Sequence, residues 1–235
     1  MTSAFVHPTA LVEDAVEIGD GSSVWDNAHL RRGAVVGTDC IIGGKSYLAN
    51  AVRLGDRCKI NAMVYICSGV TMGDGVMVAA HTTFTNDFYP RACVNDLSEL
   101  RASEVDGHTT FTTIQDGVTI GACATIGSDI VIGRFAVVGM SAVVTRSVAP
   151  YTLVLGNPAR PAALVCRCGK PFASLRDGLP ADGSYECSTC HVSYGVADGM
   201  VVTDPYDGAV PVPRPPSFEA PVSDSDPDER TELAS

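Results

Sequence analysis

The sequence predicts an all-β fold, a prism of stacked short strands, and three observations lead to that prediction. An apolar residue recurs at every sixth position through most of the chain. A small residue often stands four places after each of these apolar anchors, and glycine often stands one place after it. The repeat is interrupted once, by a gap of 30 residues between Phe84 and Ile114, and resumes in the same register.

The anchors define the expected strands. They are Val6, Val12, Ile18, Val24, Leu30, Val36, Ile42, Leu48, Leu54, Ile60, Ile66, Met72, Val78, Phe84, Ile114, Ile120, Ile126, Ile132, Val138 and Val144. A period of six fits neither an amphipathic helix nor a flat alternating strand. It fits a short strand followed by a tight turn, with three strands closing one triangular coil, so these anchors predict six to seven coils. An ordinary sandwich of short strands is the alternative, but it gives no reason for one constant register.

The residues between the anchors support a narrow interior. Ala28, Ala34, Cys40 and Cys58 are among the small residues four places after an anchor. We expect them to share the interior with the anchors. Glycines one place after an anchor are expected to relax the geometry of the turns.

Composition and charge limit the classes of function. The net charge is −11, and residues 203–235, with eight acidic and two basic side chains, account for −6 of it. The rest is ordinary for a soluble domain and favours neither nucleic acid nor an anionic membrane as partner. The sequence shows no signal peptide and no apolar run long enough for membrane insertion, so we expect a cytoplasmic protein. Nine cysteines without a secretion signal favour free thiols or a metal site over disulfides.

With this repeat the chain resembles the hexapeptide-repeat acyltransferases over roughly residues 5–165. The resemblance implies a left-handed parallel β-helix and a homotrimer with active sites between its subunits. It also implies that acetyl-CoA is the co-substrate and lies in the groove between neighbouring prisms.

The interruption, a polar loop at about residues 86–113, is expected to leave the prism at a corner. Its first part, TFTNDFYPRA, resembles a segment of the N-acetyltransferases that act on 3-amino sugars linked to UDP or dTDP. The resemblance implies that Asn86 holds the sugar amine and that Asp87 pairs with the substrate or acts as a base. A tolerated surface insertion is the alternative.

The same resemblance gives roles to the next residues of the loop. Phe88 and Tyr89 would pack over the sugar or the base, and Arg91 would bind a phosphate or anchor the loop. Attack of a neutral amine on a thioester needs no strong protein base, because the departing thiolate can accept the proton. His81 is the candidate base of an alternative, an O-acetyltransferase of the same fold.

The stretch VVGMSAVVTRSVAPYTLVLGNPARPA resembles the end of the prism in the same superfamily. The resemblance implies that backbone amides around Gly139 and Ser141 line the pantetheine arm. It makes Arg146 and Arg160 candidates for the phosphates of acetyl-CoA, and it places Asn157 in the same cofactor-binding region. Solvated surface charges are the alternative for both arginines.

A cysteine-rich module is predicted at residues 166–200. Cys166 and Cys168 form one close pair, and Cys187 and Cys190 form another, which is a spacing typical of a structural zinc site. His191 is a spare ligand, and unmetallated thiols are the alternative. Residues 203–235 are rich in proline and acidic residues and are predicted to be a disordered tail.

Together these features predict an acyl-CoA-dependent N-acetyltransferase that acts on a nucleotide-linked (UDP or dTDP) amino sugar, for synthesis of cell-surface polysaccharide or glycan precursors. The O-acetyltransferase that uses His81 remains open. So does a non-catalytic β-helix that serves as an assembly scaffold.

Overall fold

The computed structural model describes residues 3–101 and 109–209, and within those ranges it contains strands and turns but no helix. The strands are β1 (Phe5–Val6), β2 (Leu11–Val12), β3 (Glu17–Ile18), β4 (Ser23–Val24), β5 (His29–Leu30), β6 (Val35–Val36), β7 (Ile41–Ile42), β8 (Tyr47–Leu48), β9 (Arg53–Leu54), β10 (Lys59–Ile60), β11 (Tyr65–Ile66), β12 (Val70–Met72), β13 (Met77–Val78), β14 (Thr83–Phe84), β15 (Thr112–Ile114), β16 (Thr119–Ile120), β17 (Thr125–Ile126), β18 (Val131–Ile132), β19 (Val137–Val138), β20 (Val143–Val144), β21 (Thr152–Leu155), β22 (Arg160–Val165), β23 (Pro171–Ser174), β24 (Gly183–Glu186), β25 (Ser193–Ala197), β26 (Met200–Asp204) and β27 (Gly208–Ala209).

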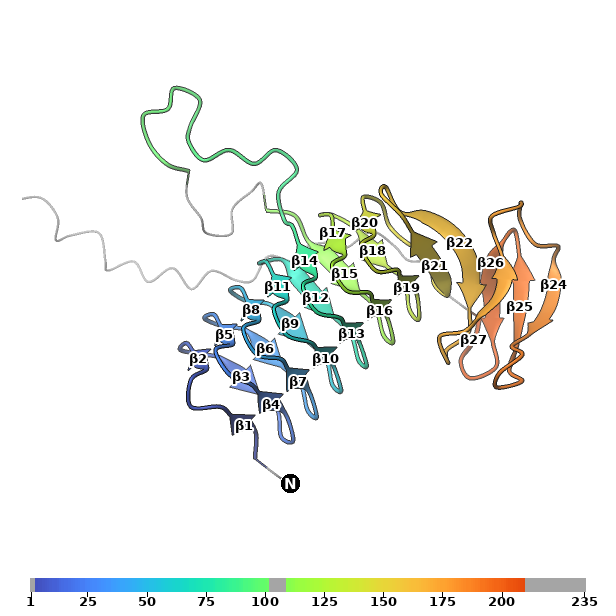
Figure 1. Cartoon of the computed structure of the whole chain (residues 1–235), viewed down its shortest axis with the longest axis horizontal. Helices are drawn as coiled ribbons and strands as arrows, with labels where there is room; N and C mark the ends of the chain where they lie inside the picture. The colour runs from blue at the N-terminus through green and yellow to red at the C-terminus, as the bar shows by residue number, and fades with distance from the viewer. Residues whose placement is uncertain (1–2, 102–108, 210–235) are drawn as a thin grey trace, which may run out of the picture.

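The first 21 strands stack as a left-handed parallel β-helix, which confirms the predicted fold class (Figure 1). Every third strand joins the same sheet: sheet A runs β1-β4-β7 and onward, sheet B β2-β5-β8, and sheet C β3-β6-β9. Val24 pairs with Ile42, and Leu30 pairs with Leu48, so one coil of the prism contains eighteen residues. We call the turns between the sheets the AB edge (such as residues 79–82), the BC edge (127–130) and the CA edge (133–136).

The predicted anchors form the core. From Val24 to Val144 each anchor is at most 3% exposed, and small partners such as Ala28 and Cys40 are fully buried beside them. Val6, in the first coil, is 40% exposed because no further coil of the described structure covers it. Each buried branched side chain contributes about 1.5–3 kcal/mol, so the ladder is the main source of stability.

The glycines after the anchors have a different purpose from the one expected. Gly37 is absent from the glycines with a positive φ angle, so it does not supply a special turn conformation. A Cβ atom there would lie 2.5 Å from the carbonyl oxygen of Gly55 in the next coil. The left-handed turn positions are instead occupied mostly by other residues, such as Asn27 and Lys45. The expectation about turn geometry is therefore wrong here, and close approach between coils explains these glycines.

The interruption leaves the stack at the BC edge, between β14 and β15, and runs away from the prism (Figure 1). Met72 pairs with Ile114, a separation of 42 residues in place of eighteen, so the insertion adds 24 residues. The stack resumes at Thr112, slightly before the expected boundary.

The last coil, at the C-terminal end of the prism, contains fewer residues than the eighteen of the regular coils. Val138 pairs with Val154, only sixteen residues further on, and sheet C is reduced there to a single bridge between Ile132 and Val148. The parallel stack therefore ends at β21, whereas the predicted domain extended to residue 165. Strands β22 and β23 continue sheet A in antiparallel fashion, and β24–β27 form a separate antiparallel sheet.

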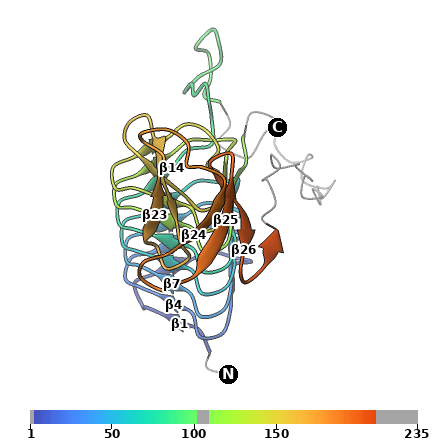
Figure 2. The same cartoon turned by 90° about the vertical axis from the view of Figure 1, so that its right-hand side faces the viewer.

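The cysteine module lies against this end of the prism (Figure 2). Tyr151 of the last coil packs with Tyr194 of the module at a ring distance of 5.6 Å. The module continues to residue 209, so part of the predicted tail is ordered. Asp204, in β26, is only 2% exposed because it accepts hydrogen bonds from Tyr151 and Arg167. Residues 210–235, the rest of the predicted tail, lie outside the described residues.

Within residues 3–101 and 109–209, no helix has the length and apolar character required to cross a membrane.

Candidate functional site

Asn86 closes the base of the extruded loop. Its side-chain Nδ2 donates a hydrogen bond to the carbonyl of Ser68, one coil below, at 3.2 Å. Its own carbonyl accepts hydrogen bonds from the backbone amide and the hydroxyl of Thr110, on the returning segment, both at 3.0 Å. The residue is half-buried. Asn86 therefore joins both ends of the loop to the BC edge, a structural role that the sequence did not indicate.

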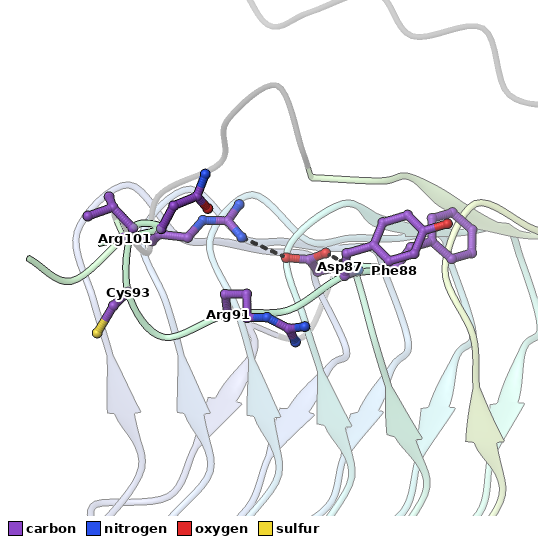
Figure 3. A pocket seen from close by; sticks show the side chains of 8 residues that line it. Asp87, Phe88, Arg91, Cys93 and Arg101 are labelled. Atoms are coloured by element: carbon purple, nitrogen blue, oxygen red, sulfur yellow. Dashed lines mark hydrogen bonds and ion pairs between the residues drawn. The ribbon is translucent and has the colours of Figure 1, made fainter. Parts of the chain in front are cut away.

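Asp87 organises the first turn of the loop. One carboxylate oxygen accepts a hydrogen bond from the amide of Tyr89 at 2.7 Å, and the other lies 3.9 Å from Nη1 of Arg101. Figure 3 shows the carboxylate of Asp87 directed toward the guanidinium of Arg101. These contacts occupy the carboxylate in part, so it is better placed to shape the loop than to act alone as a base.

The remaining loop residues border an open cavity of about 610 Å³ (Figure 3). Phe88 and Tyr89 are 55% and 85% exposed, and their rings lie 6.4 Å apart. Arg91 donates to the carbonyl of Pro90, which leaves other donors of its guanidinium available. The structure thus brings together the predicted substrate-binding residues on one loop surface that combines aromatic faces with cationic groups.

Arg146 lies on the same edge as Asn86. Each stands two places after its sheet-B anchor, and those anchors stack in order, because Phe84 pairs with Ile126 and Ile126 with Val144. Two coils separate the residues, which is about 10 Å along the prism. The guanidinium of Arg146 is exposed and has no hydrogen-bond or ion-pair partner among the described residues.

His81, Gly139 and Ser141 lie on a different edge, the AB edge. Strand β14 separates His81 from Asn86, so one protomer does not bring the two side chains together. The amide of Gly139 donates to the carbonyl of Val154, and the amide of Ser141 donates to that of Ala122. These two N–H groups therefore already have partners within the prism, and the prediction that the backbone amides around them line the pantetheine arm stays a prediction.

Asn157 and Arg160 belong to the hairpin that joins β21 to β22. The hairpin is held to β20, since the amide of Val143 donates to Gly156 and its carbonyl accepts from Ala159. Asn157 is exposed at the tip. Arg160 is also exposed, and its Nη1 contacts only the neighbouring carbonyl of Ala159. Arg146 and Arg160 border a second cavity, of about 390 Å³, between the prism and the cysteine module.

The four predicted metal ligands converge. The sulfur atoms of Cys166, Cys168, Cys187 and Cys190 all lie within 4.8 Å of one another. The sulfurs of Cys166 and Cys190 are 3.3 Å apart, and those of Cys168 and Cys187 are 3.6 Å apart. These distances are too long for disulfides, whereas tetrahedral zinc with bonds of about 2.3 Å places its sulfurs about 3.8 Å apart. The donor set fits a zinc ion.

Hydrogen bonds in the cluster favour a negatively charged sulfur. The backbone amides of Cys190 and Thr189 lower the pKa of Cys187 to about 6. The contact with Cys166 raises the pKa of Cys190 to about 12, as expected where neighbouring thiols cannot all ionise. A divalent cation would remove that repulsion. His191 pairs with Glu186 at 2.8 Å and is not part of the cluster.

A polar network that the sequence did not reveal joins the module to the prism. Arg167, between the first two cysteines, stacks on Phe135 of the prism at 4.4 Å and donates to Asp204 at 2.8 Å. Arg134, one coil below Tyr151, forms an ion pair with Asp207. The only local signal was an arginine inside the Cys-x-Cys pair, which alone does not predict a partner.

The hexad coils with their extruded loop form a left-handed parallel β-helix of hexapeptide repeats. Residues 15–50 and 51–86 match the family model described as bacterial transferase hexapeptide (six repeats). Over 40 residues the chain is 52% identical to an acyl-[acyl-carrier-protein]–UDP-N-acetylglucosamine O-acyltransferase from Brucella ovis. This match covers 17% of the chain and only 14% of that relative.

Two solved structures match parts of the chain at low identity. The acetyltransferase domain of PglB from Neisseria gonorrhoeae is 19% identical with a TM-score of 0.42, and the match covers 67% of this chain and 57% of that one. A mutant of AntD, an N-acyltransferase from Bacillus cereus in complex with dTDP and coenzyme A, is 21% identical with a TM-score of 0.43. That match covers 70% of this chain and 82% of AntD.

Proposed function

We propose that the protein is an acetyl-CoA-dependent N-acetyltransferase that acts on the amine of a UDP- or dTDP-linked amino sugar. The observation that carries the proposal is the arrangement along the BC edge. Asn86 stands at the base of the loop cavity, and the unpaired Arg146 stands two coils further along the same edge. The relative matched over 40 residues is named as an O-acyltransferase of UDP-N-acetylglucosamine, which supports a nucleotide-linked sugar as acceptor but does not favour the amine over a hydroxyl group.

In this proposal the chemistry is a simple acyl transfer. The amine nitrogen forms a bond to the thioester carbon, a tetrahedral oxyanion forms, and the carbon–sulfur bond then breaks. The amine proton passes to the departing thiolate, so the chain need not supply a strong base. Asn86 orients the amine, while Phe88 and Tyr89 cover the sugar or base and Arg91 binds a phosphate. Most of the rate enhancement comes from positioning the two substrates.

The open loop cavity favours a site shared between subunits. We propose a homotrimer in which a neighbouring prism closes the cavity and the groove for acetyl-CoA. Such an arrangement would also allow the neighbour's AB edge, with its exposed histidine, to face Asn86. We further propose that the four cysteines hold a structural zinc ion and that the protein works in the cytoplasm.

The experiment that tests the function is an acceptor panel. The purified chain is incubated with acetyl-CoA and UDP- or dTDP-linked amino sugars, each paired with the matching hydroxyl sugar, and release of free thiol is measured. Thiol release only with the amines is expected. Release only with the hydroxyl sugars would replace the proposal with the O-acetyltransferase, and His81→Ala would then abolish turnover.

The non-catalytic scaffold predicts a different result. A scaffold has no need to bind the co-substrate, so titration calorimetry with coenzyme A distinguishes the two. Binding supports the enzyme, and the absence of binding at millimolar coenzyme A favours the scaffold.

A further inference from the structure

The second cavity lies where the prism ends and the cysteine module begins. Its floor is the end of the prism core, formed by the buried side chains of Val144, Val148 and Val154. Its opposite wall comes entirely from the module, from Leu175, Leu179 and Met200. The site therefore exists only when the module is docked on the last coil.

The module wall is built by specific contacts. Leu179 lies over Gly199, where a Cβ atom would approach the leucine Cδ2 to 2.6 Å. Gly199 has a φ angle of +69° in the tight turn between β25 and β26, a conformation that glycine adopts without strain. The amide of Asp198 in that turn donates to the side chain of Asp182 at 2.9 Å. The turn and the segment that carries Leu179 are thus fixed to each other.

The lining is both apolar and cationic. Leu179 and Met200 are 71% and 41% exposed, so a large part of each apolar side chain is open to a ligand. Arg146 and Arg160 lie in the same lining, and neither has a carboxylate partner within the described residues. A guanidinium group suits phosphate oxygens, and apolar walls suit the faces of a planar ring. The matching ligand is a nucleotide that carries phosphate groups.

We infer that the cysteine module forms part of the acetyl-CoA site and that Leu179 and Met200 hold the adenosine of the co-substrate while Arg146 and Arg160 bind its phosphates. The inference rests on the proposed function, because it requires the thioester end of the same molecule to reach Asn86. Both ends then lie along the BC edge.

The docking contacts give the module a means of controlling this site. The sulfur of Cys166 and the hydroxyl of Tyr194 share a hydrogen bond at 3.2 Å, and Arg167 joins the cluster to Phe135 of the prism. Loss of the fold around the four cysteines would withdraw the wall formed by Leu179 and Met200. Binding of the nucleotide end therefore depends on the integrity of the cysteine cluster.

The test uses the full metal-loaded chain and needs no sugar acceptor. Titration calorimetry with adenosine 3′,5′-bisphosphate is compared for the wild type, for Leu179→Asp with Met200→Asp, and for the control Leu11→Asp. Leu11 is a similarly exposed leucine at the opposite end of the prism. A carboxylate in the wall should weaken binding by about tenfold or more through repulsion of the phosphates. The control should bind like the wild type, and circular dichroism and metal content should be unchanged in all variants.

Equal binding by the wild type and the double variant would overturn the inference. So would a wild type that uses a phosphopantetheine donor without adenosine as well as it uses acetyl-CoA. In the acyl-transfer assay, the double variant should raise KM for acetyl-CoA by a similar factor while kcat changes little. If the double variant transfers the acyl group normally and its KM for acetyl-CoA is unchanged, this inference fails while the proposed function stands. If no acceptor is acetylated but the bisphosphate binds as described, the proposed function fails and the pocket stands.

Discussion

Replacing Asn86 by alanine tests whether this side chain has a chemical role besides closing the loop. The substitution removes one neutral hydrogen bond, from Nδ2 to the carbonyl of Ser68. It keeps the backbone carbonyl that accepts two hydrogen bonds from Thr110. A half-buried neutral hydrogen bond contributes about 0.5–1.5 kcal/mol, so the melting temperature should fall by only a few degrees.

Activity should fall much further. If the same amide also orients the amine, its loss raises the barrier by about 2–4 kcal/mol, or about 30- to 1,000-fold in rate. The assay measures initial rates of thiol release with an amino-sugar acceptor at saturating acetyl-CoA, beside thermal unfolding of the same preparation. Asn50→Ala is the matched control, because Asn50 occupies the same register position two coils below. It should leave the rate nearly unchanged.

A small fall in melting temperature with a rate within about threefold of the wild type would refute the chemical role. Asn86 would then have only the structural role of holding the two ends of the loop to the prism. A large loss in His81→Ala under the same conditions would transfer the central role to the AB edge of a neighbouring subunit.

Three further predictions concern the prism and the module. Gly37→Ala should lower stability by about 1–3 kcal/mol in chemical unfolding, because the new methyl group meets the backbone of Gly55; an unchanged midpoint would contradict the close-approach argument. Hydrogen bonds from Arg31 and then His29 lower the pKa of Glu13 to about 2, below its unfolded value of 4.5. The ionised carboxylate therefore stabilises the fold at pH values above 4.5, and this stabilisation is lost as the pH falls toward 2. Glu13→Gln should therefore reduce the acid-induced loss of stability in melting experiments, and an identical pH profile would argue against the contact. Cys187→Ser should release zinc, measured by elemental analysis, and unfold the module before the prism, whereas retention of metal would exclude Cys187 as a ligand.

The sequence predicted the prism well because its signal is repeated at every coil. Each anchor, such as Ile42 or Ile120, must be apolar to fill a narrow interior. The buried positions can therefore be read from the six-residue period of apolar residues in the sequence. The cysteine cluster was also predictable, because thiolate ligation imposes close pairs. The contacts of Asn86, by contrast, could not be predicted, since a partner one coil away is eighteen residues distant and has no characteristic identity.

The sequence also did not predict that the candidate site residues lie on two different edges of the prism. His81 and Asn86 are only five positions apart, a spacing that does not show which edge each residue faces. A strand lies between them, so they face different edges. The network around Asp204 joins residues 37 and 53 positions away, Arg167 and Tyr151, and carries no local pattern. The folded end of the predicted tail was missed for that reason.

The insertion and the shortened last coil together show how freely this architecture can change length. One coil carries 24 additional residues and another lacks two, yet the strands on either side remain paired. Each new strand takes its register from the strand beneath it. The number of residues between two strands therefore does not have to be constant. The loop at the BC edge can therefore be lengthened, shortened or exchanged for another without altering the core. Under the proposed function, acceptor choice can change while the supporting prism, and the edge that carries Arg146, stay as they are.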